Sequence, residues 1–255
     1  MMESSEPTVA AADPHRIVIA GEGLPDETRN LAIATLLIAV GLATLDTAIA
    51  NTALPVMAHD LNTTPAGSVW IVTTYQLAMM VSLLPLAALG EIIGYRRVYI
   101  GGLVLFTAAS LLCAIAWSLP ALTVARFLQG LGGAGIMSVN TALIRFIYPS
   151  RSLGRGVGLN ALIVAIAFTV GPSVASAILA IAPWPWLFAV NVPLGILGLA
   201  FAIPSLPYTP KSPHGFDVKS ALLNAAAFGL LIFAIGEGAH QACLLYTSDA
   251  ADDMQ

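Results

Sequence analysis

The chain alternates long apolar segments with short polar gaps between residues 31 and 235. An α-helix needs about 20 apolar residues to cross the hydrocarbon of a bilayer. Seven segments reach or approach that length: Leu31–Leu54, Ser68–Leu89, Val98–Trp117, Pro120–Ile147, Val157–Ile181, Trp186–Ile203 and Ala221–Ile235. Segments that are apolar on all sides suit lipid rather than water. The pattern therefore predicts an all-α membrane protein.

The basic residues of the loops occur only in alternate gaps, which predicts the direction of each crossing. The second, fourth and sixth gaps contain the pairs Arg96 and Arg97, Arg151 and Arg155, and Lys211 and Lys219. The other three gaps contain no Lys or Arg. Because Lys and Arg collect in cytoplasmic loops, we expect a multi-pass protein of the cell membrane with its N-terminus in the cytoplasm.

Composition agrees with this interpretation and excludes several other classes. The chain is 58% hydrophobic and 9% charged, and its mean hydropathy of +0.86 lies outside the range of soluble domains. The basic residues at loop positions are explained by topology, so no nucleic-acid partner is expected. Cys113 and Cys243 offer neither a disulfide framework nor metal-ligand spacing. No metal, no cofactor and no enzyme active site is predicted.

The same reading divides the chain into regions. We expect a disordered cytoplasmic tail over 1–30, a six-helix transmembrane bundle over 31–204, a cytoplasmic loop over 205–220, a truncated seventh helix over 221–242 and an adapter-derived artefact over 243–255. The last expectation rests on two observations. The seventh apolar run stops short near Glu237, and the residues from Cys243 onward resemble the translation of a sequencing adapter.

Four sequence motifs carry further information. They are Leu45–Pro55 at the end of the first run, Ala87–Arg97 in the second gap, Arg126–Gly130 with its following glycines in the fourth run, and Gly171-Pro172 in the fifth run together with Trp186–Gly195 in the sixth. No single one of them is specific, because glycine-rich helices and Arg pairs in loops are common in membrane proteins. Their order and spacing together are informative.

Together the motifs resemble those of the major facilitator superfamily, and within it the drug:proton antiporters with fourteen spanning helices. The resemblance covers roughly residues 31–237. It implies the six-helix N-terminal half of such a transporter, built as two inverted three-helix repeats, with a C-terminal half of the same chain as its partner. Ala87, Glu91 and Ile92 depart from the Gly, Asp and Arg that are usual in the family loop, and Glu91 keeps the charge.

Asp46 and Arg126 are the candidate proton-coupling residues. A carboxylate within a span costs about 2.5–3.5 kcal/mol on insertion scales, so it should face a cavity or a partner. Burial favours its neutral form, which suits a proton carrier, although a purely structural carboxylate is the alternative. At about 1.5 Å per residue, Asp46 and Arg126 lie roughly 13 and 9 Å from the outer ends of their spans, which permits a charge pair. The alternative for Arg126 is a structural anchor bound to backbone carbonyls.

The remaining motif residues have structural interpretations beside the functional ones. Gly130 and Gly133, with neighbouring glycines, indicate close helix packing. Gly171 and Pro172 predict a bend, and the resemblance associates this pair with antiporters. Glu91, Gly94, Arg96 and Arg97 either obey the positive-inside bias alone or, by the resemblance, form a cytoplasmic loop latch that contacts the other half.

The leading hypothesis is a proton-coupled secondary transporter that exports small amphipathic or cationic compounds. Its partners are the lipid bilayer, protons and a small-molecule substrate. One alternative is uptake or exchange of a specific small solute by the same kind of transporter. A non-transporting scaffold or receptor of this fold is a third hypothesis, which the intramembrane Asp46 and Arg126 disfavour.

Overall fold

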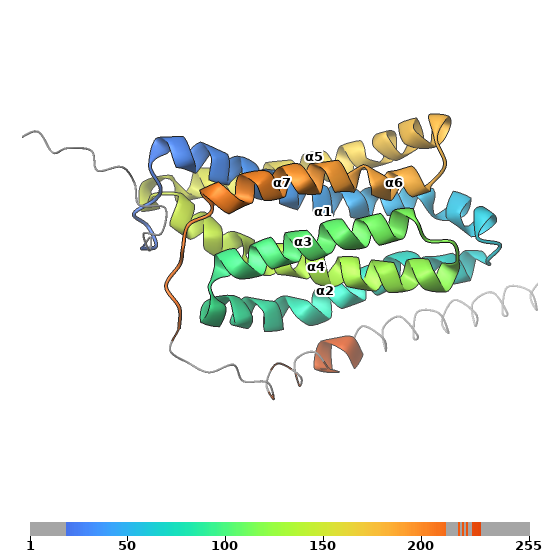
Figure 1. Cartoon of the computed structure of the whole chain (residues 1–255), viewed down its shortest axis with the longest axis horizontal. Helices are drawn as coiled ribbons and strands as arrows, with labels where there is room; N and C mark the ends of the chain where they lie inside the picture. The colour runs from blue at the N-terminus through green and yellow to red at the C-terminus, as the bar shows by residue number, and fades with distance from the viewer. Residues whose placement is uncertain (1–18, 213–218, 220, 222, 224–225, 231–255) are drawn as a thin grey trace, which may run out of the picture.

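The computed structural model describes residues 19–212, 219, 221, 223 and 226–230, and it shows a bundle of long helices (Figure 1). The α-helices are α1 (Asp26–Asp60), α2 (Pro65–Ile93), α3 (Tyr95–Ala114), α4 (Leu119–Ile147), α5 (Leu153–Ile181), α6 (Pro185–Ala189) and α7 (Asn191–Ser205), with a short 3₁₀ helix η1 (Ser150–Ser152). Within the described part of the chain, six spans are long and apolar enough to cross a membrane, and α6 and α7 together form the sixth. The predicted all-α class with six spans in the bundle is confirmed.

Most helices extend beyond the apolar runs that predicted them. α1 begins at Asp26 and continues through Pro55 to Asp60, whereas its apolar run covers Leu31–Leu54. Acidic residues in a first helical turn interact favourably with the helix dipole, as Asp26 does here. At the start of α2, the Thr64 hydroxyl accepts a hydrogen bond from the backbone N–H of Gly67 (3.1 Å). Polar residues thus form the helix ends, and hydropathy reports only the part within hydrocarbon.

The segment before α1 differs from the disordered tail that the sequence predicts over 1–30. From residue 19 onward the chain is ordered, and the backbone N–H groups of Gly21 and Leu24 donate to the carbonyls of Arg145 and Ile147 (both 3.0 Å). The last carbonyls of a helix lack partners within that helix, so this segment completes the end of α4. Residues 1–18 lie outside the described residues.

The sixth span is broken, whereas the sequence predicts one continuous run over Trp186–Ile203. Val190 separates α6 from α7. Pro193 explains the break, because it has no backbone N–H to donate to the carbonyl of Ala189 and its ring crowds that carbonyl. Asn191 therefore becomes the first residue of α7.

The predicted seventh helix over 221–242 is described only in part. Residues 226–230 are helical, and the Cβ position of Gly229 lies 3.5 Å from Cγ2 of Val81 in α2. The remainder of that prediction, part of the 205–220 loop, and the adapter-derived stretch 243–255 lie outside the described residues.

α4 lies between α2 and α3 (Figure 1) and contacts both through glycines. The Cβ position of Gly133 is 3.0 Å from the Tyr75 hydroxyl of α2, and Gly130 meets the backbone of the same residue. On the adjoining face, Gly135 lies against Gly102 of α3, with its Cβ position 2.8 Å from the Gly102 Cα. Small residues of this kind let helix backbones approach in membranes, so the expected packing role of this stripe has a geometric basis.

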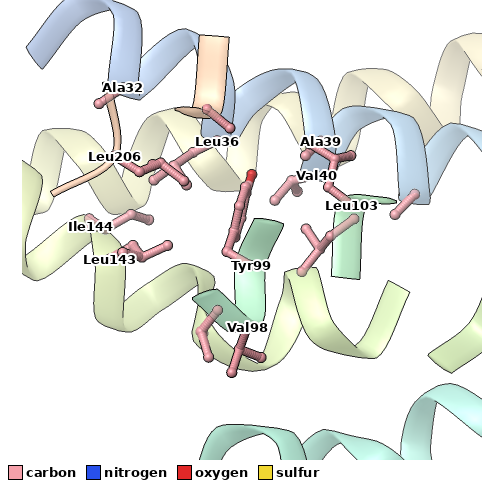
Figure 2. Packing of buried hydrophobic residues seen from close by; sticks show 14 of the residues in the cluster. Ala32, Leu36, Ala39, Val40, Val98, Tyr99, Leu103, Leu143, Ile144 and Leu206 are labelled. Atoms are coloured by element: carbon pink, nitrogen blue, oxygen red, sulfur yellow. The ribbon is translucent and has the colours of Figure 1, made fainter. Parts of the chain in front are cut away.

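Buried apolar side chains form two clusters along the bundle. One surrounds Tyr99, whose ring lies among side chains from α1, α3 and α4 and from Leu206 (Figure 2). The Tyr99 hydroxyl donates to the backbone carbonyl of Thr35 in α1 (3.2 Å). We call this end of the bundle the basic end, because it carries Arg29, Arg97, Arg145, Arg151 and Arg155. The second cluster, around Met57, Leu122 and Trp184, fills the opposite end.

Two adjacent glycines of α3 test this packing. A Cβ added at Gly102 would lie 2.8 Å from the Gly135 carbonyl carbon and 2.9 Å from the Gly132 oxygen, whereas one at Gly101 meets nothing within 4 Å. We expect Gly102→Val to destabilise the chain by about 1–3 kcal/mol through overpacking. Gly101→Val is the matched control and should leave the melting temperature in detergent unchanged. Equal effects of the two variants would contradict the close α3–α4 contact.

Candidate functional site

Asp46 lies in α1 between the two apolar clusters and is 1% exposed. Its carboxylate accepts three hydrogen bonds. Oδ2 accepts from Nη1 of Arg126 (2.5 Å), and Oδ1 accepts from Nε2 of Gln129 (2.9 Å) and Nδ2 of Asn191 (2.6 Å). The structure thus brings the two sequence-predicted residues into an ion pair, and it adds two amide side chains that the sequence analysis did not single out.

Arg126 in α4 is 0% exposed and contacts several helices. Its Nε donates to the backbone carbonyl of Ile71 in α2 (3.1 Å), and its Nη1 also donates to Oε1 of Gln129 (2.6 Å). The guanidinium carbon lies 4.2 Å from the centre of the Tyr75 ring and 5.4 Å from that of Phe188. Aromatic faces attract cations most strongly where water is excluded. Charge pairing, a backbone carbonyl and two rings therefore replace water around this cation, so the charge pair and the bond to a backbone carbonyl that the sequence allows both occur.

Gln129 links the ion pair to α3. Its Nε2 donates to the Ser110 hydroxyl (2.8 Å) as well as to Asp46, and its Oε1 accepts from the Cys113 thiol (3.5 Å). Gln129 lies three residues after Arg126, a spacing that places two side chains on the same helix face. That spacing is the sequence signal that could have identified Gln129 as a partner of the charge pair.

Asn191 reaches the site because of the break in the sixth span. It is 1% exposed and follows Val190 directly, at the start of α7. Its Oδ1 and the Nη2 of Arg126 are buried without a hydrogen-bond partner among the described residues. Only a weak signal in the sequence indicates that Asn191 belongs to the site. A single amide in an apolar run does not show which neighbouring helix its side chain faces, least of all where the helix is interrupted.

The buried ion pair is surrounded by hydrogen-bonding side chains. Removing two ions from water is costly, and the pair is tolerable only when further hydrogen bonds satisfy it, as Gln129 and Asn191 do here. A proton on Asp46 would remove the negative charge and leave Arg126 as a single buried cation. A change in proton occupancy would therefore alter the bonds that join α1 to α4 and α7. Within the described chain, no cluster of three His, Cys, Asp or Glu side chains could bind a metal.

Gly171 and Pro172 lie in α5, which packs against α1. A Cβ at Gly171 would collide with the Cβ of Ala48, two residues after Asp46 along α1. Pro172 is exposed and lies inside α5, which is continuous over Leu153–Ile181. The pair is thus close to the helix that carries the carboxylate, and Gly171 allows the two backbones to approach.

The loop latch residues lie at the basic end and do not act as one cluster. Gly94 joins α2 to α3 with a φ of +102°, a conformation open mainly to glycine. Nη2 of Arg96 donates to the carbonyl of Ile203 in α7 (2.6 Å), and its guanidinium lies 4.5 Å from the Tyr208 ring centre. Glu91 and Arg97 are exposed, and no ion pair joins either of them to another described residue.

The chain after α7 is hydrogen-bonded to the turn between α2 and α3. The backbone N–H of Tyr95 donates to the Thr209 hydroxyl (3.2 Å), and the N–H of Ser212 donates to the carbonyl of Glu91 (2.7 Å). These hydrogen bonds hold residues 206–212, which belong to the predicted 205–220 loop, against the α2–α3 turn. Sequence reasoning gave Arg96 a partner in the other half, whereas in this structure it binds α7 of its own bundle.

Six helices long and apolar enough to cross a membrane, with an ion pair buried between them, form the architecture of a multi-pass membrane protein. Residues 36–248 match the sequence pattern of the Major Facilitator Superfamily. The chain belongs to this superfamily, whose members transport solutes across membranes and are not enzymes. The family resemblance inferred from the four motifs is confirmed at this level.

Several relatives are similar over most of the chain. The uncharacterized transporter YebQ of Escherichia coli K12 is 53% identical over 85% of this chain and 48% of its own length. The riboflavin transporter RibZ of Clostridioides difficile strain 630 is 30% identical over 78% and 44%. MdtD of Salmonella paratyphi B, named as a candidate multidrug resistance protein, is 34% identical over 83% and 45%. The chain spans about half the length of the curated relatives it matches.

A solved structure of the peptide transporter POT in complex with sulfate superposes with a TM-score of 0.62 at 16% identity. The match covers 80% of this chain and 45% of POT. This likeness shows the fold, and it agrees with the expectation of one six-helix half of a larger transporter.

The contacts of Arg96 predict protection of the chain after α7 from proteolysis. The sequence contains only two lysines, Lys211 and Lys219, so lysyl endopeptidase can cut at no other position. We expect Arg96→Gln to accelerate cleavage after Lys211 severalfold, because it removes the bond to Ile203 and the contact with Tyr208. Arg97→Gln is the control, and cleavage after Lys219 is the internal reference. Identical rates of cleavage after Lys211 in the two variants would contradict a stabilising role of the Arg96 contacts.

Proposed function

We propose that this chain is the N-terminal half of a proton-coupled secondary transporter that exports small amphipathic or cationic compounds. The observation that carries the proposal is the buried Asp46–Arg126 pair, with Nη1 and Oδ2 2.5 Å apart inside six membrane spans. An ionisable residue at such a position indicates function by default, because insertion disfavours it. The basic end faces the cytoplasm in this proposal, as the distribution of Arg predicts.

Proton binding at Asp46 is the proposed step that couples proton entry to helix movement. With Asp46 charged, its carboxylate joins α1 to Arg126 of α4 and Asn191 of α7. Protonation removes the attraction for Arg126, which keeps its bond to Ile71 of α2. The balance of contacts between α1 and α4 then differs between the two charge states. A ligand, here a proton, can shift a conformational equilibrium only through such a difference.

The other motif residues support the proposal in lesser roles. Gly130 and Gly133 bring α4 close to α2 without side chains that would resist sliding. Gly171 and Pro172 place a potential bend of α5 beside α1, as in the antiporters that the motif resembles. The exposed Glu91 is available for the latch role toward the second half. Substrate sites of this fold lie between the halves at the membrane midplane.

The placement within the drug:proton antiporters with fourteen spans rests on the motifs and on MdtD, a candidate multidrug resistance protein. Transport of one specific solute is the second candidate. RibZ, a riboflavin transporter, favours it with 30% identity over 78% of this chain. Two transport measurements distinguish the candidates: the direction of substrate movement and the competition between substrates. A drug exporter expels several unrelated cations, whereas a specific carrier is saturated by its solute alone.

The coupling role of Asp46 can be tested in this chain joined to the matching second half of the Escherichia coli relative. We expect Asp46→Asn to abolish ethidium efflux driven by a pH gradient in proteoliposomes, because a neutral amide resembles the protonated acid permanently. Insertion and folding should remain. Asp60→Asn, at the far end of the same helix and partly exposed, is the matched control. Undiminished proton-driven efflux by Asp46→Asn would leave Asp46 with a structural role only.

Stability measurements test the pair separately from transport. Arg126→Ala leaves a buried carboxylate without its cation, so we expect a loss of about 3–5 kcal/mol in this chain. The double variant Asp46→Asn with Arg126→Ala should recover part of that loss, since no uncompensated charge remains. Thermal unfolding in detergent measures all the variants. Strict additivity of the two single changes would show that the two side chains do not interact energetically.

A further inference from the structure

A groove of about 610 Å³ opens at the basic end between α2, α3 and α4. Its volume lies within the roughly 300–1,000 Å³ of small-molecule sites. Apolar side chains such as Leu86, Leu89 and Leu105 form most of its wall, and the polar side chains that line it are Ser82 and Arg97. The proposed proton-coupling step uses none of these groups.

Glycines create the groove. Gly102 and Gly135 bring α3 and α4 into backbone contact and form part of its lining without adding side chains. Gly101 also lines it, and a Cβ at that position would meet no atom within 4 Å. The space along α3 is therefore open and would be filled by an ordinary side chain at this position.

A single face of α3 carries a charge followed by apolar space. Arg97, Gly101 and Leu105 are spaced four residues apart, which places them on one helix face. From Arg97 to Leu105 the helix rises about 12 Å. One leaflet of a bilayer contains about 15 Å of hydrocarbon. The groove-lining part of α3 thus extends over most of a leaflet, and Arg97 is at the end of it that we expect at the headgroups.

Arg97 is free to bind something outside the bundle. It is exposed, and its side chain has no hydrogen bond or ion pair with the part of the chain that the structure describes. The neighbouring Arg96, by contrast, is engaged by Ile203 and Tyr208. The other arginines of the basic end add to the positive field, which attracts anionic lipids by about 1 kcal/mol for each charge near the surface.

We propose that this groove binds one anionic phospholipid, with its phosphate at Arg97 and an acyl chain along α3 between α2 and α4. The charge at the mouth matches the headgroup, and the apolar wall matches the chain. Ala221 also lines the groove and supplies no charge. Because Leu131 and Gly135 of α4 line the groove, the bound lipid touches the helix that carries Arg126.

Native mass spectrometry of this chain tests the headgroup contact. The detergent-purified chain is equilibrated with equal amounts of phosphatidylglycerol and phosphatidylcholine that have identical acyl chains. We expect one retained lipid, predominantly phosphatidylglycerol. Arg97→Gln should weaken phosphatidylglycerol retention about fivefold, the factor that corresponds to about 1 kcal/mol. Arg151→Gln removes an exposed charge of the same end that does not line the groove, and it should change retention little.

Filling the groove tests the acyl-chain contact. Gly101→Leu should abolish retention of both lipids while leaving the melting temperature of lipid-free chain unchanged, because the space at Gly101 is empty. If Arg97→Gln and Arg151→Gln weaken phosphatidylglycerol retention equally, the lipid is attracted by the overall positive charge and not bound at Arg97, and the proposal is overturned. Retention that survives Gly101→Leu would place the lipid elsewhere. Failure of the unaltered chain to retain either lipid would also overturn the proposal.

Discussion

A carboxylate inside a membrane must find its hydrogen-bond donors within the protein, and at Asp46 this requirement joins three helices. Arg126 and Gln129 come from α4, and Asn191 comes from α7. An apolar cluster of similar volume would stabilise a bundle equally well or better than a buried ion pair. Stability alone therefore does not explain the Asp46–Arg126 pair, and for this reason we propose a change of charge state there. The same three donors link α1 to α4 and α7.

The glycine stripe of α4 serves the ion pair as well as the packing. Gly130 and Gly133 lie against Tyr75, so the backbone of α2 runs close to α4. This closeness lets Nε of Arg126 reach the carbonyl of Ile71 and lets its guanidinium stack on the Tyr75 ring. A bulkier α4 would separate the helices and leave the cation with fewer partners. Close packing and charge stabilisation are thus one feature of this sequence.

The sequence could predict what lipid imposes on every span. Hydropathy predicted seven apolar segments, of which the first six are spans in the described structure, and helical rise alone placed Asp46 and Arg126 at similar depth. The site's amides were missed because depth says nothing of rotation about the helix axis. Asn191 begins α7 after the break at Val190, and the direction of its side chain there depends on tertiary packing. The order before α1 was missed for a similar reason: Gly21 and Leu24 each donate to a carbonyl of α4, which is distant in sequence.

α7 connects the two polar regions of the bundle. Its first residue, Asn191, donates to Asp46, and near its other end the carbonyl of Ile203 accepts from Arg96. The hydroxyls of Ser205 and Thr35 are 3.3 Å apart and join that end to α1. The 15 residues of α7 form a helix about 22 Å long. A short helix of this kind moves as a rigid body, so a movement of one end also moves the other. If a change of charge at Asp46 shifts Asn191, the far end of α7 should therefore also move, at the point where Arg96 donates to the carbonyl of Ile203.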